Sequence, residues 1–329
     1  MSLPTVVLFA TGGTIASLLP EDPARGYAPA LRGEEVLRRI PGHRDVARIE
    51  LVDLSLVRGG NMTPQVAADL CRQVNAALRR PEVTGAVISH GTTTLEDTCF
   101  LADLLVRGDK PVIGTGAMYH ASWPEWDGRR NLLNSLRAAT SPESRQKGVM
   151  VCMNGELHAA RDVTKDHASS PAAFVSPGSG PLGCVDGGEV IYYRSPACRY
   201  TFPTEDIVGP VDVIKVVQGA DDRLVRASVA SGARGLVLEG LPGYGALPSD
   251  LLPAIRETHD RGVPVVISTR SPLGRVSLTA SAAMVELGEA GVIPAGDLPS
   301  HKARLLLMVA LAHARGEDEI RAAFRTVAP

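Results

Sequence analysis

Residues 6–17 read Val-Val-Leu-Phe-Ala-Thr-Gly-Gly-Thr-Ile-Ala-Ser, and this order of residue types decides the fold. The run 6–10 is short, apolar and rich in β-branched residues, which predicts a buried strand. Gly12 and Gly13 interrupt the run, because glycine allows backbone angles and close approaches that other residues resist. Thr14 follows at once. The stretch therefore predicts a hydroxyl on a tight turn at the carboxyl end of a strand, where open α/β sheets bind ligands.

A second stretch, residues 83–98, repeats this arrangement. It opens with another short apolar run and then carries Thr92, Thr93 and Thr94 on a turn, followed by residues with helical spacing. We expect Thr94 to cap that helix, which leaves Thr92 and Thr93 facing the edge of the sheet. One Gly-Gly pair after a strand also fits a plain or phosphate-binding turn, but a second threonine-rich strand end favours a site that both stretches share.

Both stretches resemble the two threonine motifs of the bacterial asparaginase/glutaminase family. The likeness continues in order through most of the chain. It includes residues 11–16, 90–92, 95–98, 110–112, 116–118, 127–132, 153–155, 161–165 and 180–183. Each motif is short, but together the two threonine motifs and residues 161–165 are highly specific. The resemblance implies an amidohydrolase that uses a threonine nucleophile.

Composition limits the classes of partner. The chain has 329 residues, of which 44% are hydrophobic, so it can bury a sizeable core and is long enough for two domains. Its net charge of −2 offers no electrostatic footprint for nucleic acid or an anionic membrane. No apolar run approaches the ~18 residues that span a bilayer. We therefore expect a small-molecule amide as partner, with no nucleic acid and no membrane.

Cysteine and histidine usage bears on location and cofactors. The five cysteines are odd in number and no pair has CxxC spacing, which favours buried thiols in a reducing compartment. The first residues lack the basic and apolar regions of a secretory signal, so we expect a cytoplasmic protein. The histidines show no ligand spacing, so we expect no metal. Residues 178–183 match GxGxxG, but no buried strand precedes them, and we expect no cofactor.

Strand and helix patterns alternate up to about residue 155 and again after residue 210, which predicts parallel sheets. Residues 195–210 are polar, contain three prolines and lack either periodicity. We predict an α/β fold with a large N-terminal parallel-sheet α/β domain over residues 1–194. A linker over 195–210 leads to a smaller C-terminal flavodoxin-like α/β domain over 211–329.

Amide hydrolysis needs a nucleophile, a base that takes its proton, and donors for the oxyanion. Thr14 and Thr92 are the candidate nucleophiles, and Lys165 is a candidate base because burial lowers a lysine pKa. The resemblance implies that Thr14 attacks with help from Tyr27, while Thr92 and Lys165 serve the second half-reaction and the Ala117 backbone holds the amide group. Taken singly, Thr92 also fits a capping hydroxyl and Lys165 a solvated charge. The order in which the two threonines act stays open.

The amino-acid clamp of the family is missing from this sequence. In the family, an Asp follows the second threonine and binds the substrate α-ammonium group; here that residue is Thr93. A Ser and a Gln or Glu are replaced by Gly59 and Gly60, and the Asn that a neighbouring subunit contributes is replaced by Ala246. Each lost charge-assisted hydrogen bond weakens binding by ~1.5–3 kcal/mol. The resemblance and its departures therefore predict a small amide without a free α-amino-acid head.

We expect hydrolysis through an acyl-threonine intermediate in a homodimer or homotetramer whose sites are shared between subunits. Two alternatives remain at this point: an L-asparaginase that binds asparagine through non-standard contacts, and a catalytically silent homologue that senses a ligand. Retention of Thr14, Tyr27, Thr92 and Lys165 argues against silence, because a dead site has no physical need for all four.

Overall fold

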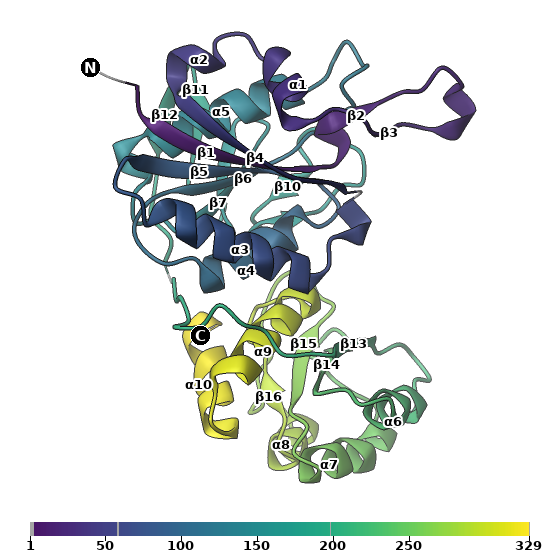
Figure 1. Cartoon of the computed structure of the whole chain (residues 1–329). Helices are drawn as coiled ribbons and strands as arrows, with labels where there is room; N and C mark the ends of the chain where they lie inside the picture. Colours follow the sequence, from purple (N-terminus) through teal and green to yellow (C-terminus); the bar gives the residue numbers. More distant parts are fainter. Residues whose placement is uncertain (1–2, 58, 198, 329) are drawn as a thin grey trace. The chain divides into compact units, whose positions relative to one another are not determined.

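The computed structural model describes residues 3–57, 59–197 and 199–328 (Figure 1). The chain divides into two compact units, one ending at Thr201 and the other beginning at Phe202. This division falls within residues 195–210, whose described part forms no helix or strand. We propose that these residues link the two units.

The first unit is built on an eight-stranded sheet with the order β12-β11-β8-β7-β6-β5-β1-β4. Five neighbouring strands pair in parallel: β1 (Thr5–Gly12), β4 (Arg48–Val57), β5 (Val83–Ser89), β6 (Val112–Thr115) and β7 (Val149–Met153). Three strands on one side are antiparallel: β8 (Glu156–Ala159), β11 (Gly183–Asp186) and β12 (Glu189–Tyr192). The prediction of a large, mostly parallel sheet is confirmed.

Helices cover both faces of this sheet, as Figure 1 shows. One face carries α3 (Pro64–Leu78) and α4 (Leu95–Leu105), and the other carries α1 (Gly33–Arg38), α2 (His43–Val46) and α5 (Gly128–Thr140). Thr63 and Pro64 start α3 as their residue types predict, with the Thr63 hydroxyl accepting from the Val66 amide at 3.2 Å. Successive residues of β1 are buried on alternate faces; Val6 and Leu8 join the core beneath α1 and α5.

Short elements complete the first unit. The hairpin of β2 (Ser17–Leu18) and β3 (Ala28–Pro29) follows the 3-10 helix η1 (Thr14–Ala16) and reaches out beyond the sheet (Figure 1). A second small pair joins β9 (Thr164–Lys165) to β10 (Phe174–Val175). Three further 3-10 turns are η2 (Pro23–Arg25), η3 (Gly59–Asn61) and η4 (Pro142–Ser144).

The second unit contains a four-stranded parallel sheet in sequential order: β13 (Val211–Lys215), β14 (Gly235–Gly240), β15 (Val265–Thr269) and β16 (Ile293–Pro294). Its helices are α6 (Arg223–Ala230), α7 (Leu252–Asp260), α8 (Ala282–Glu289), α9 (Ser300–His313) and α10 (Glu317–Val327), with a 3-10 turn η5 (Ser249–Leu251). The smaller α/β domain is confirmed. A flavodoxin places its first strand inside the sheet, so the likeness to flavodoxins is one of class and not of strand order.

Among the residues described, no helix is both long and apolar enough to cross a bilayer. In the first unit, β1, β4, β5 and β6 run in parallel, so their carboxyl ends meet at one edge of the sheet. Of the residues predicted to be functional, Thr14, Gly59, Thr92 and Ala117 lie on the loops that follow these four strands.

Candidate active site

Glycines allow three strand-end loops to touch backbone to backbone. A Cβ on Gly13, after β1, would lie 2.3 Å from the Gly91 Cα. A Cβ on Gly91, after β5, would lie 2.8 Å from the Gly59 Cα. Real Cβ atoms do not approach other atoms so closely, and Gly13 also has a φ of +82° that favours glycine. These glycines bring the turns that carry Thr14, Gly59 and Thr92 into contact.

Lys165, on β9, contacts the turn that carries Thr92. Its Nζ donates to Thr92 Oγ1 at 3.0 Å, although the two residues are 73 positions apart. Thr92 is 5% exposed, so this hydroxyl is shielded from water. Burial lowers the pKa of Lys165, while the negative charge of Glu96 partly opposes that shift. A lysine with a lowered pKa is a stronger candidate for a base than a solvated one.

Glu96 is the acidic neighbour of this pair, and sequence reasoning assigned it no role. It lies in the first turn of α4 and is 9% exposed, and one of its carboxylate oxygens accepts from the Lys165 amide at 3.3 Å. Thr93 is neutral, so Glu96 is the acidic side chain whose charge acts on Lys165. The sequence shows Glu96 as a glutamate in the first turn of a predicted helix. That position alone does not indicate a role in the site, because a glutamate there also interacts favourably with the helix dipole.

His90 shapes the turn and does not supply a base. One ring nitrogen, Nδ1, donates to the Gly91 carbonyl at 2.8 Å, and the Thr98 hydroxyl donates to Nε2 at 3.0 Å. Complete burial lowers the pKa of His90 to about 4, so the ring is neutral near pH 7. Its two hydrogen bonds hold the start of the Thr92 turn against α4.

Thr14 and Tyr27 lie on the segment that follows β1. Thr14 begins η1 and is partly buried, and its carbonyl accepts from the Ser17 amide. Tyr27 precedes β3 and is 51% exposed. No hydrogen bond joins these two side chains in the described part of the chain; the Tyr27 ring instead stacks on His120, with centroids 5.1 Å apart. The fold thus places Tyr27 on the hairpin that starts directly after Thr14.

Ala117 is fully buried on the loop after β6. The preceding residue, Gly116, lies against the turn that carries Thr92, because a Cβ on Gly116 would be 3.0 Å from Thr92 Cγ2. The Asn131 side chain donates to the Gly116 carbonyl at 3.0 Å. The loop that carries Ala117 therefore borders Thr92. A backbone group that binds the substrate amide would have to lie at such a position.

The positions of the missing clamp also gather here. Gly59 faces Thr93 closely enough that a Cβ on Gly59 would lie 3.2 Å from both Thr93 Cβ and Oγ1, whereas nothing lies within 4 Å of a Cβ on Gly60. Thr93 itself is exposed. Thr94 occupies the cap position of α4, but its hydroxyl makes no capping bond and donates to the Gly59 carbonyl at 2.8 Å. The expected cap is wrong: Thr94 ties the Gly59 loop to the Thr92 turn.

Ala246 belongs to the second unit, where it is partly buried and its carbonyl accepts from the Leu241 amide at 2.9 Å. The first unit by itself brings together the loops of the other predicted site residues. It contains Thr14, Tyr27, Gly59, Gly60, Thr92, Thr93, Ala117 and Lys165.

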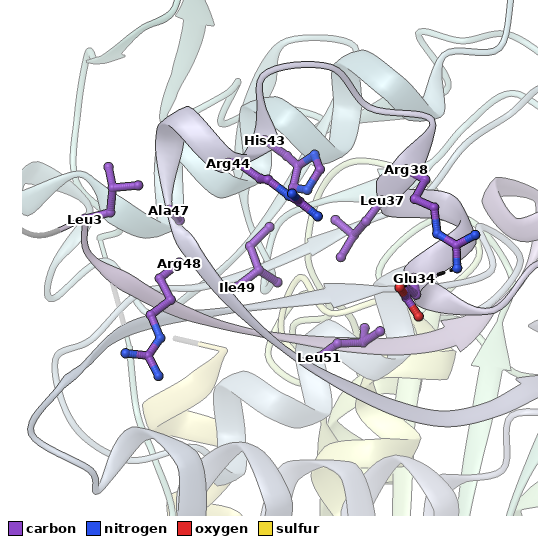
Figure 2. A pocket seen from close by; sticks show the side chains of 10 residues that line it. All are labelled: Leu3, Glu34, Leu37, Arg38, His43, Arg44, Ala47, Arg48, Ile49 and Leu51. Carbon is purple, nitrogen blue, oxygen red and sulfur yellow. Dashed lines mark ion pairs between the residues drawn. The ribbon is translucent and has the colours of Figure 1, made fainter.

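A pocket of about 520 Å³ lies elsewhere in the first unit, between α1, α2 and the first half of β4 (Figure 2). Its lining includes Arg44, Arg48 and Ile49 near the amino end of β4. The threonines follow the carboxyl ends of their strands, and none of the predicted site residues lines this pocket. Within the described residues, no group of three or more His, Cys, Asp or Glu side chains is arranged to hold a metal ion.

Comparison with known proteins identifies the family. The profile described as "Asparaginase, N-terminal" matches residues 5–198, and that described as "Glutaminase/Asparaginase C-terminal domain" matches residues 210–324. A glutaminase-asparaginase from Acinetobacter glutaminasificans is 34% identical over 97% of this chain and 98% of its own. L-asparaginase 2 from Escherichia coli K12 is 32% identical, with coverage of 98% and 93%.

A solved structure is similar throughout. The crystal structure of a probable cytoplasmic L-asparaginase from Campylobacter jejuni has a TM-score of 0.88 and 28% identity, and the match covers 98% of this chain and 99% of that one. This chain belongs to the asparaginase family and is an amidohydrolase.

Proposed function

We propose that the protein hydrolyses a small amide through an acyl-threonine intermediate. In the first half-reaction, the Thr14 oxygen attacks the amide carbon while Tyr27 relays the Thr14 proton to the leaving nitrogen, the C–N bond breaks, and ammonia or an amine leaves. In the second, water attacks the Thr14 ester, the carboxylic acid leaves, and the Thr14 hydroxyl is restored. The bond from Lys165 Nζ to Thr92 Oγ1, 3.0 Å long and largely shielded, is the observation that carries this proposal.

Thr92 and Lys165 suit the role of activating water. A neutral lysine amine takes a proton through the Thr92 hydroxyl to which it is hydrogen-bonded, and burial of Lys165 favours that neutral form. Helix α4 begins at Leu95, directly after the Thr92 turn, so its positive end lies beside the place where oxyanion charge would develop. Both features favour hydrolysis over simple binding.

We further propose that the substrate is a small amide, linear or cyclic, without a free α-amino-acid head. Gly59 and Gly60 contribute no side chain, and Thr93 is exposed and uncharged, so the side chains at these three positions supply no charged partner for an α-ammonium or α-carboxylate group. Losing two or three charge-assisted hydrogen bonds of ~1.5–3 kcal/mol each reduces discrimination in favour of a free amino acid by roughly a hundredfold or more.

Two alternatives make different predictions. Relatives named L-asparaginase or glutaminase-asparaginase favour a protein that hydrolyses asparagine through contacts other than the family clamp. A silent, ligand-sensing homologue would bind an amide without releasing ammonia. The partly buried Lys165–Thr92 bond argues against silence, because partial burial of an unused lysine amine has a cost and brings no benefit.

The proposal extends to assembly and location. We infer a homodimer or homotetramer in which Ala246 of one subunit completes the site of another, since closed symmetry is the common form of soluble enzymes. The buried thiol of Cys152 suits a reducing compartment, and we propose the cytoplasm. The similar crystal structure is titled a probable cytoplasmic L-asparaginase, whereas one relative is named a periplasmic enzyme.

Restoring the clamp tests the substrate proposal. The triple variant Gly59→Ser, Thr93→Asp and Ala246→Asn should raise kcat/KM for asparagine by up to about a thousandfold, from ~1.5–3 kcal/mol for each contact regained. Gly59→Ser alone should gain little, because its new Cβ would lie 3.2 Å from both Cβ and Oγ1 of Thr93. Aspartate at position 93 is not branched at Cβ, so it would relieve the second of these close contacts. The three changes should therefore be non-additive.

The matched control carries Thr93→Asn in place of Thr93→Asp, which keeps the shape and omits the charge; its kcat/KM for asparagine should rise far less.

Sedimentation velocity on the same samples should show a dimer or tetramer, as a shared site requires. A monomer, or a triple variant no better on asparagine than the starting protein, contradicts the proposed clamp.

A further inference from the structure

Both tryptophans of the chain, Trp123 and Trp126, lie in the loop that joins β6 to α5. This loop also carries His120, whose ring is sandwiched between two others. The Tyr27 ring stacks on one side with centroids 5.1 Å apart and an interplanar angle of 26°. The Trp123 ring stacks on the other side at 5.4 Å and 9°. Tyr27, His120 and Trp123 thus form a three-ring stack that joins two loops distant in sequence.

The loop side of the stack is held firmly. The Asp127 carboxylate accepts from the Met118 amide at 3.0 Å and from the Tyr119 amide at 2.9 Å. The Tyr119 ring meets Trp123 edge-on with centroids 4.8 Å apart. His120 is 8% exposed, and the Trp123 amide donates to its carbonyl at 2.9 Å. These contacts fix the His120 and Trp123 rings against the first unit.

The hairpin side is held at its base. Ala121 donates its amide to the Ser17 carbonyl at 2.8 Å, and Leu19 donates its amide to Ser122 Oγ at 3.0 Å. Farther out, the hydrogen bonds of residues 20–26 stay within that segment, as in the Arg25 amide to the Asp22 carbonyl at 3.2 Å. For the outer part of the hairpin, the stack of Tyr27 on His120 is therefore a contact with another loop of the unit.

We propose that His120 and Trp123 are positioning residues, whose stacked rings hold Tyr27 and with it the outer part of the hairpin that follows Thr14. This inference rests on the proposed role of Tyr27 in the first half-reaction. Aromatic pairs favour the stacked state beyond what burial alone contributes. Loss of either ring should therefore open the hairpin more often and leave Tyr27 misplaced, without touching the threonines or Lys165.

Trypsin provides a direct measure of hairpin opening. Arg25 lies near the tip with its side chain 80% exposed, and Gly26 follows it, so cleavage between them requires this segment to leave its seat. The fragments 1–25 and 26–329 identify the cut by mass. His120→Ala and Trp123→Ala should each be cleaved about tenfold faster than the wild-type protein. His120→Phe and Trp123→Phe, which keep a ring, should be cleaved at close to the wild-type rate.

The kinetic readout separates positioning from general damage. The substrate is whichever of asparagine, glutamine, acetamide, propionamide and benzamide the wild-type protein hydrolyses fastest. With this substrate, the two alanine variants should have a kcat about tenfold lower than wild type and a KM within about twofold of it. The two phenylalanine variants should recover kcat. Thermal unfolding of all four variants shows which of them fold.

The outcomes are distinguishable. If the folded alanine variants are cleaved at the wild-type rate, the ring stack does not hold the hairpin. If they are cleaved faster but keep the wild-type kcat, the stack holds the hairpin but does not position Tyr27 for catalysis. Tyr27→Phe keeps the ring but loses the hydroxyl, so its cleavage should stay slow while its kcat falls. Full activity of Tyr27→Phe would remove the hydroxyl from the proposed function, and the cleavage rates would still decide whether the ring stack holds the hairpin.

Discussion

Thr14→Ala and Thr92→Ala should each lower kcat by at least about 10³-fold, as loss of a group within a concerted catalytic unit does. Both residues lie on loops after strands and neither belongs to a helix or strand core, so we expect the variants to fold, with a modest loss of thermal stability for the buried Thr92. The measurement is ammonia release, combined with mass spectrometry for an acyl group on the protein. In Thr92→Ala the acylated form should accumulate, because water activation is lost while Thr14 can still attack.

Thr140→Ala is the matched control, since its hydroxyl donates to the Arg137 carbonyl at the end of α5 and has no part in the site. It should retain full activity. A Thr14 or Thr92 variant that turns over as fast as this control would remove that threonine from the mechanism.

Lys165→Met should reduce the rate by about 10²–10⁴-fold, the usual contribution of a positioned general base. The sign of the pH dependence follows from the shift: burial lowers the pKa of Lys165 below its ordinary value of 10.5, and the neutral amine is the active form. The rate of the starting protein should therefore rise with pH through this lowered pKa and level off above it.

Glu96→Gln sharpens this test. Its negative charge raises the pKa of Lys165 against the effect of burial, so removing it should move the rising limb of the pH profile to lower pH. The amide keeps an oxygen that can accept from the Lys165 backbone. A flat profile in the starting protein, or a limb that Lys165→Met leaves in place, is incompatible with Lys165 as the base.

Much of the first unit could be predicted from local residue patterns. The apolar runs before Gly12 and before His90 form β1 and β5, because β-branched runs bounded by glycine suit a sheet covered on both faces. The antiparallel strands β8, β11 and β12 were harder, since each has four residues and too little periodicity to show its direction. The turn at residues 186–188 still indicated the hairpin between β11 and β12.

The site was predictable where chemistry is carried by residue type, and less so where it depends on tertiary contacts. Thr92 and Lys165 were named from their motifs, but their hydrogen bond depends on the β9–β10 pair, which no local pattern reveals. Thr94 reads as a cap from its own helix; the competing acceptor, the Gly59 carbonyl, comes from another loop. The same holds for the stack of His120 on Tyr27, whose partners lie 93 positions apart in the sequence.

The most direct test measures ammonia or amine release from a panel of amides, with L-asparaginase 2 from Escherichia coli assayed in parallel. The panel contains asparagine, glutamine, and linear and cyclic amides that lack an α-amino-acid head. We predict that this protein gives its highest kcat/KM with an amide of the last group, by at least about tenfold over asparagine, since one lost contact of ~1.5 kcal/mol is already worth that factor. If asparagine were its best substrate, hydrolysed as fast as by the parallel enzyme, the account of a missing clamp would be contradicted.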